Sequence, residues 1–228
     1  MGKAGRRSLH SSTHQATPVL APMSLHSYVV RYDSGFAPNP FYGYCTLATC
    51  KPKIRANAKI GDWIVGSGSG DRTVHRAGHL VYAMRITEAL SWDQYSSDPR
   101  FRAKQPSRRG SRKQTCGDNI YFRAGQGAPW QQRDSFHSHN DGTANQDHIN
   151  RDTGVNRILI SNDFIYLGGE GPLIPDQLRD HTGRPLCKGG IGHSKFEDPQ
   201  LIDALLAWIR SLGHNGFQGS PQEWLALR

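Results

Sequence analysis

Residues 33–41, Asp-Ser-Gly-Phe-Ala-Pro-Asn-Pro-Phe, place a carboxylate, an amide and two aromatic rings in one short loop. The two prolines stiffen this loop, because each fixes its own φ and restricts the residue before it. Asp33 and Asn39 can therefore be held in set positions. Phe36 and Phe41 could hold a base between them, and stacking is worth ~1–3 kcal/mol per base. An ordinary turn, with Asp33 capping it and Phe36 in the core, explains these residues equally well.

A second polar pair lies in residues 116–121, Cys-Gly-Asp-Asn-Ile-Tyr. Asp118 offers an acceptor-only carboxylate, and Asn119 offers an amide that both donates and accepts. Such a pair can position a water molecule or read the edge of a base. The bland alternative is a turn before a strand, since Gly-Asp-Asn is common turn chemistry. The position of the pair directly after a strongly basic stretch favours the functional interpretation.

Residues 123–153 are polar and contain almost no aliphatic side chain, which predicts a long stretch without regular structure that is functional or disordered. The His, Asp and Asn residues in this stretch suggest metal binding, but their spacing matches no zinc motif. A loop that contacts DNA or lines a pocket is the favoured interpretation, and we predict neither a metal nor a cofactor. The four cysteines, at 45, 50, 116 and 187, form no Cys-x-x-Cys pair and are expected to be buried thiols.

These segments supply the candidate site residues. The proposed catalytic residues are Asp33, Asn39 and Asp118. The side chains expected to contact the substrate are Phe36, Phe41, Tyr42, Asn119, Tyr121, Trp130, His139 and His148.

The chain is basic, with 28 Lys and Arg against 19 Asp and Glu. A formal charge of +9 favours a polyanionic partner, and nucleic acid suits it better than a membrane because no basic amphipathic helix is evident. Residues 99–114 carry seven of these charges and no acidic residue, which predicts a mobile loop. The cationic side chains expected to contact the DNA backbone are Lys51, Lys53, Arg55, Arg108, Arg109, Arg112 and Lys113.

A length of 228 residues suits one domain with a sizeable core. We expect a disordered basic tail over 1–26 and a single domain over 27–228. The chain lacks a secretory signal, a membrane-spanning run and the cysteine density of a disulfide scaffold, so we expect a cytoplasmic protein. No obligate protein partner is evident.

The elements that must position these residues are mostly strands. Alternating or apolar patterns predict strands at 27–32, 61–66, 79–87, 119–122, 157–161 and 164–168, with a hairpin-like junction between the last two, and a strand or a short helical turn at 44–49. Residues 66–70 predict a flexible loop, residues 88–95 a short helix, and residues 199–212 an amphipathic helix. Trp224 is expected in the core. Strands first and a helix last predict an α+β fold with a curved, mainly antiparallel sheet or a PUA-like barrel and a C-terminal helix. The alternative is an α/β fold of the glycosylase type.

The motifs Ala-Pro-Asn-Pro-Phe at 37–41 and Cys-Gly-Asp-Asn-Ile-Tyr at 116–121 are distinctive. Together with the His-rich stretch and the strands at 157–168, they resemble the nucleotide modification associated domain 2 family over roughly residues 27–175. This resemblance implies a link to modified bases of bacterial and phage DNA. Within that range it implies a glycosylase that excises glucosylated hydroxymethylcytosine-type bases from phage DNA, in antiviral defence.

A glycosylase needs an aromatic slot, polar groups that read the base edge, and a basic groove on double-stranded DNA. Asp33 or Asp118 could stabilise the oxocarbenium-like sugar, and Asn39 could hold the attacking water or the leaving base. No lysine is placed as a Schiff-base nucleophile, so a monofunctional enzyme that leaves abasic sites is expected. The alternatives are a reader that binds a modified base without catalysis, an accessory protein or transferase of base modification, and an RNA-binding PUA-like module.

Overall fold

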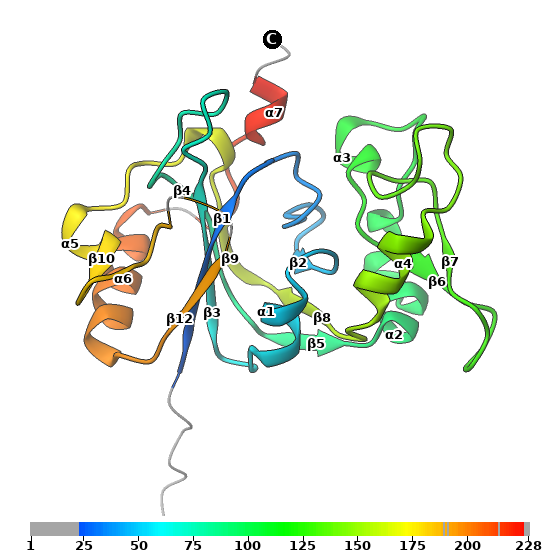
Figure 1. Cartoon of the computed structure of the whole chain (residues 1–228), viewed down its shortest axis with the longest axis horizontal. Helices are drawn as coiled ribbons and strands as arrows, with labels where there is room; N and C mark the ends of the chain where they lie inside the picture. The colour runs from blue at the N-terminus through cyan, green and yellow to red at the C-terminus, as the bar shows by residue number, and fades with distance from the viewer. Residues whose placement is uncertain (1–22, 189, 191, 214, 226–228) are drawn as a thin grey trace, which may run out of the picture.

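A computed structural model describes residues 23–188, 190, 192–213 and 215–225. Its main feature is a six-stranded sheet with the order β12-β1-β3-β4-β9-β13 (Figure 1). The strands are β1 (Leu25–Val30), β3 (Trp63–Gly68), β4 (Leu80–Arg85), β9 (Asp163–Tyr166), β12 (His193–Phe196) and β13 (Gly216–Phe217). Two neighbouring pairs, β1–β3 and β9–β13, are parallel, and the other three are antiparallel. The sheet is open, so the predicted α+β class is confirmed and the barrel is not formed.

A smaller antiparallel sheet lies beside the first and contains β2 (Cys45–Leu47), β8 (Ile158–Ser161) and β5 (Glu88–Leu90). Strand β8 pairs with β2 and β5, whereas β9 pairs with β4 and β13. The predicted hairpin-like junction at 162–163 is therefore wrong, because the chain passes there from one sheet to the other. Helix α1 (Pro52–Asn57) follows β2 and was not predicted.

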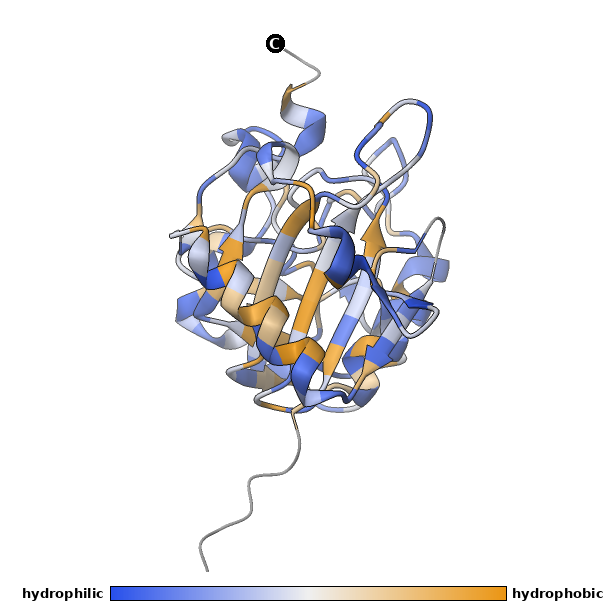
Figure 2. Cartoon of the chain, turned by 90° about the vertical axis from the view of Figure 1, so that its left-hand side faces the viewer, coloured by the Kyte–Doolittle hydropathy of each residue, from blue (hydrophilic) through white to orange (hydrophobic). Residues whose placement is uncertain are grey.

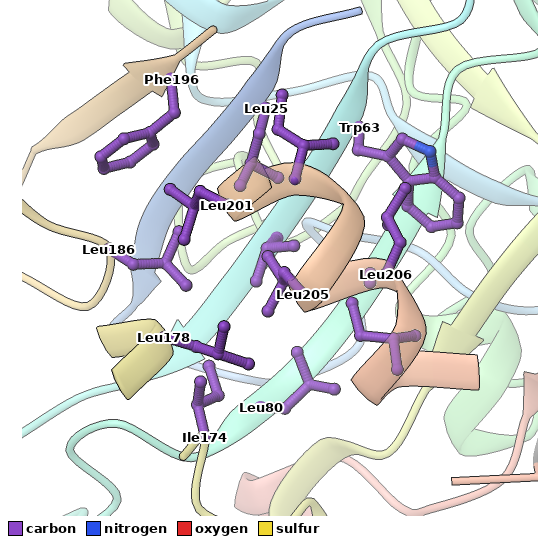
Figure 3. Close-up of a cluster of buried hydrophobic side chains, with 14 of the residues drawn as sticks. Leu25, Trp63, Leu80, Ile174, Leu178, Leu186, Phe196, Leu201, Leu205 and Leu206 are labelled. Atoms are coloured by element: carbon purple, nitrogen blue, oxygen red, sulfur yellow. The ribbon is translucent and has the colours of Figure 1, made fainter. Parts of the chain in front are cut away.

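Helix α6 (Pro199–Ser211) covers one face of the large sheet (Figure 2). Asp198 caps its first turn, accepting hydrogen bonds from the backbone N–H groups of residues 200 and 201. Its buried side chains, among them Leu201 and Leu205, pack against Leu25 and Trp63 of the sheet (Figure 3). The helix predicted for 199–212 is thus confirmed. Together with the face of the sheet that it covers, it encloses the largest apolar cluster of the described residues.

Residues 92–153 form a second body, here called the polar lobe, on the side of the molecule away from α6 (Figure 1). It contains α2 (Trp92–Ser97), the short 3-10 helix η1 (Pro99–Lys104), α3 (Arg112–Thr115), β6 (Tyr121–Phe122), β7 (Gln131–Gln132) and α4 (Gln146–Thr153). Its core is aromatic, with Trp92, Tyr95 and Phe101 fully buried. The remaining elements are η2 (Gly168–Glu170), α5 (Asp176–Arg179), β10 (Asp180–His181), β11 (Arg184–Pro185) and α7 (Gln222–Leu225).

Three predictions about local structure are corrected. Residues 88–95 form a strand and then a helix that starts at a capping box on Ser91. The basic stretch 99–114 is not a mobile loop, because η1 buries Phe101 and Ser111 caps α3. The polar stretch 123–153 contains β7 and α4, whose buried face carries Ile149 and Asp152.

Other predictions concern loops and ends. The glycine-rich segment 66–70 is strand as far as Gly68, and a Cβ at Gly66 would lie 2.4 Å from the Tyr82 ring. Trp224 is only half-buried, and it stacks on Phe41 with ring centroids 5.5 Å apart. The disordered tail predicted for 1–26 lies mostly outside the described residues, and β1 already begins at Leu25. No helix in the described part of the chain has the length and apolar character needed to cross a bilayer.

Candidate active site

Cys50 lies at the turn between β2 and α1, where the backbone is unusual. Cys50 and Lys51 have φ values of 57° and 41°, in the left-handed region that non-glycine residues rarely enter. Such a conformation costs about 1–3 kcal/mol per residue and persists only where the surrounding structure enforces it. Pro52 then opens α1, and its fixed φ suits the first helical position. The turn leaves the Cys50 side chain partly accessible.

His137 and Asp152 complete a chain of three polar side chains with Cys50. The Cys50 Sγ and the His137 Nε2 are 3.7 Å apart. On the other side of the imidazole ring, His137 Nδ1 lies 2.7 Å from Asp152 Oδ2, a distance at which Nδ1–H donates to the carboxylate. The order nucleophile, imidazole, carboxylate is that of the catalytic triads of cysteine and serine hydrolases.

Asp152 holds this arrangement from several sides. Its Oδ2 accepts a hydrogen bond from the Tyr121 hydroxyl at 3.0 Å. Its Oδ1 accepts from the backbone N–H of Cys50 and from Nε of Arg151, both at 3.3 Å. The carboxylate is therefore fully buried and fully paired, which fixes the orientation of His137 relative to Cys50.

The three groups shift one another's pKa values towards an ion pair. Burial alone would raise the pKa of Cys50, but the hydrogen bond and positive charge of His137 outweigh burial and lower it. Burial would lower the pKa of His137, but Asp152 and Cys50 raise it. The pKa of Asp152 is lowered, because His137 and Arg151 outweigh its burial. The arrangement thus favours a thiolate beside an imidazolium, which is the reactive form of a cysteine nucleophile.

A cavity of about 400 Å³, here called the Cys50 cavity, lies next to the triad. This volume is within the range of small-molecule sites, about 300–1,000 Å³. Cys50 and His137 line it together with Tyr28, Tyr32, Phe36, Lys51 and Phe136. A nucleophile and its base therefore share a cavity whose lining includes four Tyr and Phe rings.

A smaller cavity of about 210 Å³, here called the Asp33 cavity, shares Val30, Arg31, Tyr32 and Glu223 with the first. Asp33 lines it, accepting a hydrogen bond from the Tyr166 hydroxyl and another from the backbone N–H of Gln222 at 3.0 Å. Burial raises the pKa of Asp33 to about 6, although the Tyr166 and Gln222 hydrogen bonds oppose the shift. Among the three residues predicted to be catalytic, Asp33 is the one that lines a cavity.

Asn39 and Asp118 both lie in the interior of the protein and line neither of these two cavities. Asn39 donates a 2.7 Å hydrogen bond to the carbonyl of Cys116, so the two sequence motifs do lie together. Both side chains are fully buried, and Asp118 accepts hydrogen bonds from Thr46 at 2.5 Å and from Tyr95 at 2.7 Å. These positions do not fit the catalytic roles expected of Asn39 and Asp118, because no substrate atom can reach them in this conformation.

A buried lysine joins this interior network. Lys104 is 0% exposed, and its Nζ donates to Asn39 Oδ1 at 2.5 Å, to Asn39 O at 3.0 Å and to Tyr44 O at 2.9 Å. Burial lowers its pKa to about 8, while the negative charge of Asp118 acts in the opposite direction. Asn119, also buried, donates to the carbonyls of residues 95 and 101. The network joins the 33–44 loop to the polar lobe.

The aromatic and imidazole residues expected to bind substrate are divided between sites. Phe36 lines the Cys50 cavity and contacts His137, with ring centroids 4.8 Å apart. Phe41 is buried against Phe217 and Trp224, so the predicted sandwich of a base between Phe36 and Phe41 does not fit the structure.

The remaining predicted contacts lie elsewhere. Tyr42 faces a separate pocket, and Tyr121 is buried, where its hydroxyl donates to Asp152. Trp130 packs against Arg123, whose guanidinium carbon lies 4.4 Å from the centre of the indole ring. His139 is exposed, whereas His148 contacts the ring of His137 at 4.4 Å.

Arg55 is the clearest exception among the cations expected to contact DNA. It is 0% exposed, and its guanidinium donates to the carbonyls of Cys50 at 3.0 Å and of Asp152 at 2.8 Å. It therefore holds the backbone of two members of the triad in place, and because it is buried it cannot contact a phosphate. Lys51 lines the Cys50 cavity, while the exposed remainder consists of Lys53, Arg108, Arg109, Arg112 and Lys113.

Sequence reasoning missed the triad because its members are distant in the chain and match no short motif. The one usable signal was the presence of unpaired cysteines together with histidines and aspartates elsewhere, which allows a cysteine nucleophile but does not choose among the four cysteines. Among the described residues, no three His, Cys, Asp or Glu side chains are arranged to hold a metal ion.

Comparison with known proteins gives one match. A family model described as nucleotide modification associated domain 2 matches residues 22–228. No curated protein and no solved structure matches the chain.

Proposed function

Since the chain belongs to the nucleotide modification associated domain 2 family, we propose that it is an enzyme that removes an acyl group from a modified base of DNA through a covalent intermediate at Cys50. The observation that carries this proposal is the Cys50–His137–Asp152 chain at the edge of a cavity of about 400 Å³. Family membership supports a role in nucleotide modification, and the triad supports the type of reaction.

In the first step, the Cys50 thiolate attacks the carbonyl carbon of the acyl group and forms a sulfur–carbon bond. The bond between that carbon and the base nitrogen breaks, and the His137 imidazolium gives its proton to the leaving nitrogen. Asp152 keeps the proton on His137 Nδ1, so that Nε2 exchanges protons with the reacting groups.

In the second step, water attacks the thioester carbon while neutral His137 takes a proton from this water. The sulfur–carbon bond breaks, a carboxylic acid leaves, and the thiolate–imidazolium pair is restored.

Double-stranded DNA with modified bases is the proposed partner. The formal charge of +9 and the exposed cations Lys53 and Arg109 supply the electrostatic attraction that DNA binding requires. A base inside a duplex must leave the stack before a side chain can reach it, so the enzyme would act on an extruded base.

The test uses oligonucleotides that carry N4-acetylcytosine or N6-acetyladenine, each beside its unmodified counterpart. Mass spectrometry of the digested nucleosides is expected to show loss of the acyl group with the base still attached to its sugar. Rapid quenching should trap an acyl adduct on Cys50. Cys50→Ala should abolish both signals, because Cys50 is the cysteine that lines the cavity and contacts His137.

Cys187→Ala is the matched control, since Cys187 is also half-buried but burial raises its pKa. The control should act like the wild-type protein. The proposal is overturned if wild-type protein neither deacylates any of these oligonucleotides nor forms an adduct.

A second candidate function is N-glycosidic cleavage at Asp33, as the sequence resemblance implied. The favouring observation is the carboxyl group of Asp33 at the wall of its own cavity, with a pKa of about 6. An ionised carboxylate there could stabilise positive charge on the sugar.

With DNA that carries glucosylated hydroxymethylcytosine, this function predicts a free modified base and abasic sites, measured by mass spectrometry. The rate should rise as the pH passes through about 6, where Asp33 loses its proton. Asp33→Asn should abolish release, and Cys50→Ala should retain it. Release by Asp33→Asn at the wild-type rate would exclude this carboxylate.

A further inference from the structure

We propose that Tyr32 and Phe136 form an aromatic clamp that holds the base of a nucleotide at the mouth of the Cys50 cavity, with Arg31 and Lys51 placed for its phosphate. This inference identifies a nucleotide as the substrate class of the Cys50 cavity. It rests on the proposed function only for the reaction that the bound base undergoes. It replaces the pair Phe36 and Phe41, of which Phe41 is buried in the core.

The first observation is exposure. Tyr32 is 64% exposed and Phe136 is 46% exposed, although large aromatic side chains usually bury most of their surface. Both line the Cys50 cavity, whereas Tyr42 faces a different pocket. Exposed aromatic rings at the edge of a cavity can stack on a planar group of a ligand, and this cavity also contains a nucleophile.

The second observation is that each ring is supported from its own segment. Tyr32 is the second residue after β1, and the guanidinium carbon of Arg31 lies 5.1 Å from the centre of its ring. Phe136 packs on Phe36, with ring centroids 5.6 Å apart. The segment that carries Phe136 is held by Arg108, which donates to the carbonyl of Ser135 at 2.9 Å. Supported rings lose less conformational entropy when a base stacks on them.

The third observation is charge. Arg31 and Lys51 both line the cavity, and Lys51 Nζ lies 4.4 Å from the centre of the Tyr28 ring. Arg31 is half exposed and its ion pair with Asp71 is long, 3.6 Å, so it can turn to a phosphate at small cost. Glu223 is the acidic side chain of the cavity, and burial raises its pKa above the ordinary value.

Aromatic rings, two cations and a volume of about 400 Å³ together match the chemistry of a nucleotide. A ring that stacks on a base does not distinguish one base from another, because every base has a π-face. The clamp would therefore hold any base, and selection for the modification would take place deeper in the cavity, near Cys50 and His137.

The test uses 2-aminopurine, whose fluorescence falls when it stacks on an aromatic ring. Wild-type protein is titrated into single-stranded oligonucleotides in which one 2-aminopurine lies between two abasic sites, so that no neighbouring base quenches it beforehand, and into the free 2-aminopurine mononucleotide. We expect quenching on binding. Tyr32→Ala and Phe136→Ala should each raise Kd about five- to tenfold and reduce the quenching.

Tyr32→Phe keeps a ring and should bind and quench as the wild type does. Tyr42→Ala, which removes an exposed ring outside the cavity, is the matched control and should also behave as the wild type. The unfolding midpoint of each variant, followed by circular dichroism, separates loss of the clamp from loss of the fold.

Quenching with the oligonucleotides alone identifies nucleic acid as the source of the base, and quenching with the mononucleotide alone identifies a free nucleotide. Either result supports the clamp. Absence of quenching by wild-type protein, or unchanged Kd in both Ala variants, overturns it. Cys50→Ala should still quench, so a failure of the proposed chemistry and a failure of the clamp give different results.

Discussion

Iodoacetamide is expected to alkylate Cys50 of the wild-type protein with a pH midpoint below that of an ordinary thiol, about 8.5. The reactive species is the thiolate, and His137 lowers the pKa of Cys50 against the effect of burial. His137→Ala removes the lowering influence and leaves burial, so the pKa should rise above the ordinary value. The alkylation rate near neutral pH should then fall by more than about tenfold, since each pKa unit changes the thiolate fraction tenfold.

Peptide mass spectrometry resolves this experiment by residue. Cys187 in the same protein molecule is the internal control, because burial raises its pKa and His137 does not contact it. Asp152→Asn should give a smaller rise in the pKa of Cys50, since the imidazole remains but loses the carboxylate that stabilises its positive charge. An alkylation rate of Cys50 that is the same in wild type and His137→Ala would contradict the ion pair.

Asp118→Ala is expected to lower the free energy of unfolding by more than about 2 kcal/mol, because each buried donor that loses its acceptor costs about 1–3 kcal/mol. The Lys104 ammonium would stay fully buried without the nearby negative charge that favours its protonated form. The hydroxyls of Thr46 and Tyr95 would also lose their acceptor. Urea denaturation measures the change.

Asp163→Ala is the matched control, because Asp163 pairs with Arg85 at 2.7 Å and both side chains are nearly half exposed. Its loss should cost no more than about 1 kcal/mol. The double variant Lys104→Met with Asp118→Leu should be more stable than Asp118→Ala, since both charges are then absent. A cost for Asp118→Ala as small as that of the control would show that the Lys104 network does not hold the lobe in place.

Strong periodicity was sufficient to predict some elements. In helix α6 an acidic cap and a proline at the first position mark the start, and a stripe of apolar residues marks the buried face. The polar lobe was mispredicted because each of its segments is anchored by few apolar residues, such as Phe101 and Ile149. A single buried ring in a basic segment gives no periodic pattern, and the short helices there begin at caps that sequence reading did not weigh.

The candidate site was predicted only in part. Asp33 and Phe36 were predicted and do line cavities. Asn39 and Asp118 have the same residue types and the same turn context, but they bind other parts of the protein. Sequence does not distinguish these cases, because a polar side chain in a turn can form hydrogen bonds equally well to a ligand or to buried groups of the protein itself. His137 and Asp152 acquire their roles only through contact with Cys50, which no local pattern contains.

The triad draws on two bodies of the fold, since Cys50 follows β2 whereas His137 and Asp152 belong to the polar lobe. Arg55 of α1 joins the two bodies, because it donates to the carbonyls of both Cys50 and Asp152. Nucleophilicity is therefore a property of the completed tertiary structure. Before the lobe has docked, Cys50 has no imidazolium beside it, so its thiolate fraction near neutral pH is that of an ordinary thiol and its reactivity toward electrophiles is lower than in the folded protein.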